Sequence, residues 1–340
     1  MSDGTQDTLR ERSDRNTALL RLLLERDRRL LAAGIVLLLF LAVSLVALAY
    51  PDVVGSLRTG DPTETLFQAL TAATVTGVTL VLTLNQLVIS QELGAVGDQR
   101  ERMEAALTFR SDAADTLGTP ASPPEPAAFL RALVDVAGET ADTLETSLDT
   151  DDDQLRDRVE SLTGSTRENA ETVHDELNDA RFGDYGVLSA ALNFNYSWKL
   201  YAARRLREAH ADELGEEARD ALDEFIETLE LFGPAREHFK TLYFQWELVD
   251  LSRAMLAAAI PALVVAVSTL LFFDPAKVTG ATLGVPHVVL GVSAAAAVSL
   301  LPFALLLSYV LRIATVTKRT LSIGPFILRE TDRETDEDWE

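Results

Sequence analysis

The chain has 340 residues, of which 47% are hydrophobic and 24% are charged, and its formal net charge is −23. It contains no cysteine, which excludes disulfide bonds, thiolate nucleophiles and cysteine-ligated metal or iron–sulfur sites. The region from Glu92 to Asp250 holds 36 acidic and 15 basic residues and therefore carries most of the negative charge. Because nucleic-acid binding needs clustered Lys and Arg, we expect no nucleic-acid partner.

Four segments are long, apolar and free of Asp, Glu, Lys, Arg and His. They are Leu30–Tyr50, Leu66–Ser90, Ala254–Phe273 and Val288–Leu311. A helix needs about 20 apolar residues to cross about 30 Å of hydrocarbon, so each segment is long enough to span a lipid bilayer. Pro261 and Pro302 fall inside two of them, and kinks there are tolerated in membrane helices. The polar run before Leu30 is too long for a secretory signal, so we expect the first segment to be retained.

Basic residues near the ends of these segments predict the orientation of the chain. The only basic residues in the two short loops, 51–64 and 274–286, are Arg58 and Lys277. The other ends are flanked by Arg26, Arg28, Arg29, Arg100, Arg102, Arg253, Arg312, Lys318 and Arg319. We therefore predict a multi-pass protein of the cell membrane whose N-terminus, C-terminus and middle region are cytoplasmic.

The predicted fold class is all-α: a four-helix transmembrane bundle (2+2) with an α-helical cytoplasmic domain inserted between the two helix pairs. Residues 30–92 form transmembrane helices 1 and 2, residues 93–250 the acidic helical domain, and residues 251–312 transmembrane helices 3 and 4. Residues 313–340 are an acidic cytoplasmic tail. Residues 1–29 are a cytoplasmic amphipathic segment that either lies along the membrane surface or extends the first helix.

Periodicity and breaker residues predict the helices of the middle region. The second span is expected to continue past Glu92 to Leu117, where a stretch rich in Gly and Pro follows. Gly233-Pro234 is predicted to stop a helix, and a new helix from Ala235 is expected to run into the third span. The remaining helices are predicted at 127–148, 154–180, 187–213 and 216–231.

One face of the second span carries small and polar side chains. At spacings of three and four residues it consists of Ala69, Ala72, Thr76, Thr79, Thr83, Gln86 and Ser90. Such a face either packs closely against another helix or lines a water-filled pore, and both interpretations remain open. Asn85 lies on a different face and is expected to bond to a neighbouring helix.

An acidic stretch offers a weak metal-site candidate. Asp149, Asp151, Asp153 and Glu160 match positions 1, 3, 5 and 12 of an EF-hand calcium loop. Gln154, however, occupies the position of the glycine that the sharp turn of this loop requires. An acidic turn between two helices is the simpler interpretation.

Catalytic signatures are missing from the sequence. It has no His-Glu-x-x-His motif, no Gly-rich phosphate loop and no Gly-x-Ser-x-Gly elbow. We therefore predict no enzymatic activity and no cofactor. An aromatic and basic cluster is expected to place its rings in a core and to pair its arginines with acids; it comprises Phe194, Tyr196, Trp198, Tyr201, Arg204, Arg205 and Arg207.

The acidic, lysine-poor composition resembles that of proteins from extremely halophilic archaea, in which concentrated salt screens the self-repulsion. Over the whole chain, the organisation resembles uncharacterised four-span membrane proteins of haloarchaea. Two helix pairs around a helical cytosolic domain also look like the plan of bestrophin and bestrophin-like channels. Gly324-Pro325-Phe326 lies after the last span and not within one, so no functional residue is carried over from that family.

Two functions fit these features. The first is an oligomeric ion channel, a homo-oligomer in which Thr76, Thr79, Thr83, Gln86 and Ser90 face a central axis. The absence of Asp, Glu, Lys, Arg and His from the spans argues against proton-coupled transport. The second is a membrane-anchored scaffold or sensor whose cytoplasmic helices bind a protein partner, with the spans serving only as an anchor.

Overall fold

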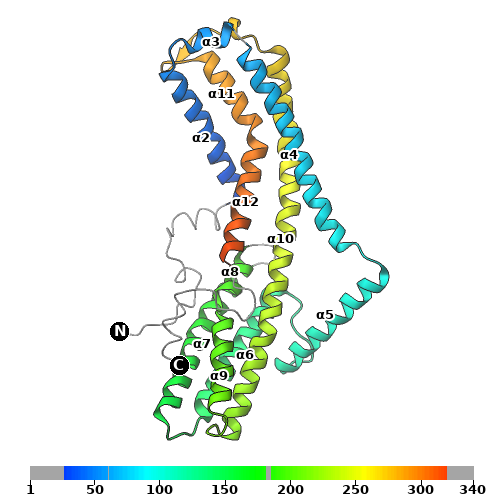
Figure 1. Ribbon diagram of the computed structural model, residues 1–340, viewed down its shortest axis with the longest axis vertical. Helices are drawn as coiled ribbons and strands as arrows, with labels where there is room; N and C mark the ends of the chain where they lie inside the picture. The colour runs from blue at the N-terminus through cyan, green and yellow to red at the C-terminus, as the bar shows by residue number, and fades with distance from the viewer. Residues whose placement is uncertain (1–26, 60, 181–184, 320–340) are drawn as a thin grey trace. The chain divides into compact units, whose positions relative to one another are not determined.

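The computed structural model describes residues 27–59, 61–180 and 185–319, and nearly all of them are helical (Figure 1). The chain divides into two compact units. The span unit comprises Ala18–Leu93 and Gln245–Val316, and the bundle unit is built on Gly94–Phe244. The all-α prediction is confirmed for the described residues, apart from one very short hairpin. Most of the predicted N-terminal segment and tail lies outside them.

The span unit contains the four predicted apolar segments as helices. Its elements are α2 (Arg28–Ala49), α3 (Val53–Thr59), α4 (Pro62–Glu92), the second part of α10 (Glu216–Phe272), η1 (Pro275–Lys277), β1 (Ala281–Thr282), β2 (Val285–Pro286), α11 (His287–Ser299) and α12 (Leu301–Arg319). Among the described residues, α2, α4 and α10 are each long and apolar enough to cross a membrane. The pair α11 and α12 meets the same criterion as one span with a bend of 47°.

The bend between α11 and α12 has a local cause. Leu300 ends α11 with its N–H bonded to the carbonyl of Ala296, and Pro302 follows at the start of α12. Proline has no N–H to donate and its ring crowds the preceding turn, so it interrupts the hydrogen-bond ladder here as predicted. At Pro261, by contrast, α10 continues without a break.

Small residues bring the helices of the span unit close together. Ala32 of α2 packs with Ala258 of α10 and Ala304 of α12. At Gly77 of α4, a Cβ atom would lie only 3.1 Å from the Cε of Met255 and 3.3 Å from the ring of Phe303. Close backbone approach through Gly and Ala is how helices pack in lipid, where no hydrophobic force drives them together.

The two short connections of the span unit are tied to each other. Arg58 of α3 donates from Nε to the carbonyl of Pro275, at 3.3 Å, and from Nη2 to that of Val278, at 2.9 Å. In the second connection, the backbone N–H of Ala276 and the ammonium of Lys277 hold the pKa of Asp274 below its usual value. Arg58 therefore links the two connections through two backbone carbonyls.

The bundle unit is a helical domain around one apolar core. Its elements are α5 (Val96–Thr116), α6 (Pro126–Ser147), α7 (Asp153–Asp179), α8 (Tyr185–Asn193), α9 (Tyr196–Ala209) and the first part of α10. Leu133, Leu162 and Phe225 are fully buried members of that core. Phe194, Tyr196 and Trp198 are buried as predicted, whereas Tyr201 is exposed.

Three predictions of helix continuity are wrong. The second span does not run on to Leu117: α4 ends at Glu92, and Leu93 and Ala95 adopt extended backbone before α5 begins. Gly94 lies in this break and disfavours helix by about 1 kcal/mol relative to Ala, whereas Gly97 is accommodated inside α5. The helix predicted at 187–213 divides into α8 and α9 near Asn195.

The predicted stop at Gly233-Pro234 is the third error, because α10 passes through both residues. A Cβ on Gly233 would lie 2.9 Å from the ring of Tyr196, so this glycine makes room for an aromatic neighbour. The flanking Phe232 and Ala235 are buried in the core. Their packing offsets the roughly 3 kcal/mol that a proline costs in a helix interior.

Candidate functional site: the hydroxyl face of α4 and a buried ion pair

Helix α4 has two different faces. The inward face packs against the rest of the span unit through Phe67, Leu70, Thr74, Gly77 and Val81, all of which are buried. The hydroxyl face, defined as Thr76, Thr79, Thr83, Gln86 and Ser90, is exposed along its whole length. Packing within one chain therefore does not use the predicted polar face.

The hydroxyls of this face bond to their own helix. Thr76, Thr79 and Thr83 each donate to the carbonyl four residues earlier, at 2.9 Å. Ser90 donates to the carbonyl of Leu87 at 2.7 Å. Because each hydroxyl proton is directed back to the backbone, the lone pairs of the oxygen remain available outward. At about 1.5 Å of rise per residue, the row of acceptors extends over roughly 20 Å.

Asn85 lies beside this face and is half-buried. Its Oδ1 atom is buried and accepts no hydrogen bond from any described residue. Within one chain, this oxygen does not make the predicted bond to a neighbouring helix. An unsatisfied buried acceptor costs about 1–3 kcal/mol.

A buried ion pair joins the helices of the span unit at a place that the sequence analysis missed. Arg28 at the start of α2 pairs with Glu247 of α10, and the two side chains are only 21% and 2% exposed. The guanidinium of Arg28 also lies over the ring of Tyr309 of α12, 5.0 Å from its centroid. Three helices therefore meet at one charged centre.

This centre is only partly satisfied. The Nε of Arg28 and the Oε2 of Glu247 are both buried without a hydrogen-bond partner among the described residues. In the sequence, Arg28 is interpreted only as a marker of orientation. The pair could have been predicted from the positions of both residues, because Arg28 and Glu247 lie at the same predicted membrane face. Opposite charges on neighbouring helices can pair there.

The predicted calcium ligands are not gathered into one loop. Only residues 148–152 separate α6 from α7, fewer than the twelve of an EF-hand loop. Asp149 and Asp151 lie in this turn, Asp153 begins α7 and pairs with Arg156, and Glu160 lies two turns further along α7.

A different group of three possible metal ligands does come together in the bundle unit. Asp152, His210 and Glu213 offer ligand atoms within 4.8 Å of one another. Asp152 already accepts from the backbone N–H of Gln154 as the cap of α7, and His210 Nδ1 lies 2.8 Å from Glu213. Arg158 Nη1 lies 3.1 Å from His210 Nε2, and its positive charge opposes a cation at this position.

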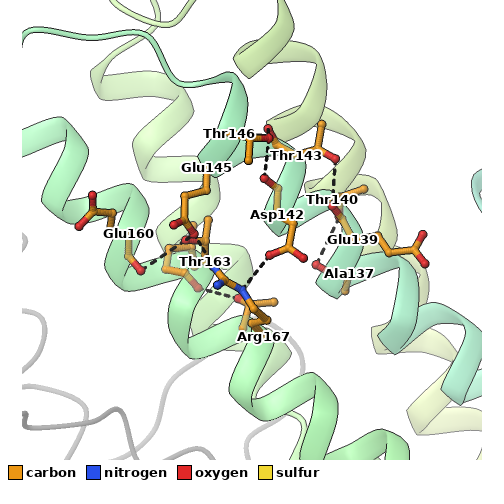
Figure 2. Close-up of polar contacts among 12 residues, drawn as sticks. Ala137, Glu139, Thr140, Asp142, Thr143, Glu145, Thr146, Glu160, Thr163 and Arg167 are labelled. Carbon is orange, nitrogen blue, oxygen red and sulfur yellow. Dashed lines mark hydrogen bonds and ion pairs between the residues drawn. The ribbon is translucent and has the colours of Figure 1, made fainter.

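Some arginines of the bundle unit pair with acids on its surface, such as Arg204 with Glu230 and Arg207 with Asp223. Figure 2 shows Arg167 of α7 between two carboxylates of α6: its Nε lies 2.7 Å from Asp142, and Nη2 pairs with Glu145. Thr163 also donates to Glu145, at 2.7 Å. The three charged side chains are all more than a third exposed, so water weakens these pairs and they contribute little to stability.

Comparison with known proteins identifies a family but no activity. No curated protein and no solved structure matches the sequence. The resemblance to bestrophin-like channels therefore stays a prediction about organisation. A family model described as a family of unknown function, DUF7972, matches residues 1–340. The chain belongs to this family.

Proposed function

We propose that the protein is a subunit of a homo-oligomeric membrane channel in which the hydroxyl face of α4 lines the conduction path. The observation that carries the proposal is that the hydroxyl face of α4 is exposed and takes no part in packing within the chain. Large apolar side chains of α4, such as Leu80 and Leu87, are exposed beside it. The hydroxyl protons bond to the helix backbone, so the face presents oxygen lone pairs. Rings of such oxygens replace part of the hydration shell of a cation, and we infer conduction of cations.

The orientation follows from the distribution of arginine and lysine along the chain. Both termini and the bundle unit are on the cytoplasmic side, and the two short loops with Arg58 and Lys277 are outside. In this arrangement the outer end of α4 carries Asp61 and Glu64. These carboxylates attract cations to the outer mouth of the channel.

The proposal is tested by cation flux into liposomes that contain the purified protein. We expect rubidium uptake by the native chain and about a tenfold decrease for the double variant Thr79→Val/Thr83→Val, which keeps the shape and removes two oxygens. The matched control is Thr74→Val on the buried face, whose hydroxyl makes the same bond to its own helix, at 2.8 Å. This control is expected to retain uptake. No uptake by the native protein, or equal uptake by the double variant, contradicts the proposal.

The scaffold function is the second candidate, and one observation favours it. In the bundle unit, α5 leaves Val96, Met103 and Leu107 exposed by 86%, 61% and 59%. Apolar side chains in a row on a solvated helix are typical of a surface that a partner helix covers. Under this proposal a stoichiometric protein partner co-purifies with the native chain and is lost from Met103→Asp/Leu107→Asp. Cation uptake that persists in this double variant separates the two functions.

A further inference from the structure

A cavity of about 280 Å³ lies within the bundle unit, between α5, α6, α10 and the proline-rich turn after α5. Three aromatic rings form its walls. Phe109 and Phe129 have ring centroids 6.0 Å apart, and Phe239 meets Phe129 edge to face at 6.2 Å. The volume is close to the lower end of the range for small-molecule pockets, roughly 300–1,000 Å³, and the apolar lining is typical of such pockets.

The cavity is held open by rigid parts of the chain. Pro123, Pro124 and Pro234 contribute to its lining, and proline fixes its own backbone angle φ. Arg110 of α5 secures the turn by donating from Nη2 to the carbonyls of Ser122, at 2.6 Å, and Pro123, at 3.3 Å. A preformed pocket does not have to be ordered when a ligand binds.

The charge of the lining is opposite to that of the chain. In a chain of net charge −23, the described residues that line the cavity include no acid, and their only ionisable groups are Arg110 and His238. The Nε and Nη1 donors of Arg110 bond to no described residue. A guanidinium with free donors beside an apolar cavity matches a carboxylate that is attached to an apolar body.

We propose that this pocket binds a small apolar monocarboxylate, with its apolar body packed against the phenylalanine rings and its carboxylate at Arg110. Binding of this ligand is independent of conduction by α4. A bicyclic aromatic acid is a suitable probe because it combines flat apolar rings with one carboxylate.

The test measures calorimetric binding of 2-naphthoate to the full chain in lipid nanodiscs, at the lowest salt that keeps the protein folded and with empty nanodiscs as the blank. We expect saturable binding at one site per chain and about tenfold weaker binding of the neutral alcohol 2-naphthalenemethanol. Arg110→Gln is expected to bind the acid and the alcohol about equally, because the preference for the acid depends on the guanidinium. A looser turn weakens both ligands alike and leaves this ratio interpretable.

A variant that fills the pocket completes the test. Ala106 lines the cavity but is exposed on α5, so Ala106→Phe blocks the cavity without disturbing the core and is expected to abolish binding. The neighbouring Ala105 is also exposed and does not line the cavity, so Ala105→Phe is expected to bind like the native chain. The proposal is overturned if the native chain does not bind 2-naphthoate, if Ala106→Phe binds it normally, or if Arg110→Gln keeps the preference for the acid.

Discussion

Both units join helices by pairing arginine with a carboxylate, but the two environments are opposite. In the bundle unit the Arg167 pairs lie on a solvated surface that covers an apolar core. In the span unit the Arg28–Glu247 pair is buried, while large apolar side chains such as Leu38 and Leu45 are 67% and 64% exposed. Burial, more than residue type, therefore sets how much the loss of one partner of an ion pair changes the stability.

The largest effect is expected at Glu247. Glu247→Leu leaves Arg28 buried without its partner, and loss of one member of a buried pair costs about 3–5 kcal/mol. The free energy of unfolding in detergent is therefore expected to fall by about this amount.

The double variant Arg28→Met/Glu247→Leu is the control for this prediction. Because it leaves no isolated charge, we expect it to recover most of the lost stability. A double variant that is no more stable than Glu247→Leu would show that the charges themselves are not responsible.

A smaller effect is expected at Gly233, where a Cβ atom would lie 2.9 Å from the Tyr196 ring. Gly233→Ala is expected to lower the free energy of unfolding by about 1–3 kcal/mol through overpacking, although Ala favours helix by about 1 kcal/mol. Gly164→Ala on α7 is the matched control, since nothing lies within 4 Å of that position and Ala is expected to stabilise it. The midpoint temperature of thermal unfolding is expected to fall for Gly233→Ala and to rise for Gly164→Ala. A rise for both variants would refute the role assigned to Gly233.

In the span unit, Asn85→Leu removes the unsatisfied Oδ1 and is expected to raise the free energy of unfolding by about 1 kcal/mol. Chemical unfolding in detergent measures the change. A loss of stability would instead mean that Asn85 has a partner in the assembled protein.

The smallest effect is expected in the bundle unit at Arg167. A double-mutant cycle of Arg167→Gln with Glu145→Gln is expected to give a coupling of at most about 1 kcal/mol, because both side chains are more than a third exposed. The coupling is expected to disappear at high salt, where charges at the surface are screened. A coupling that persists in concentrated salt would contradict this prediction, because it would mean that the Arg167–Glu145 pair is shielded from solvent like the Arg28–Glu247 pair.

Much of the fold could be predicted because its signals are local. Length and apolarity identify all four apolar segments, and helical spacing groups the small and polar residues of α4 on one face. The bend at Pro302 also follows from the chemistry of one residue. Each of these features depends only on neighbouring positions in the chain.

The prediction errors arise where contacts between residues far apart in the sequence determine the local structure. Gly233-Pro234 is a strong local stop signal, but packing against Tyr196 keeps the helix continuous. Arg28 and Glu247 are far apart in the sequence, so their pairing is visible only once α2 and α10 are packed. The pocket beside Arg110 likewise forms from three separate helices.

The most direct test of the proposed channel uses the absence of cysteine from the chain. Thr79→Cys on the hydroxyl face and Leu38→Cys on the exposed apolar face of α2 are placed in liposomes and treated with a charged, water-soluble thiol reagent. A hydroxyl face that lines a water-filled path predicts rapid labelling of Thr79→Cys and no labelling of Leu38→Cys. If Thr79→Cys is as unreactive as Leu38→Cys, the face of α4 is not in contact with water and the proposed channel is contradicted.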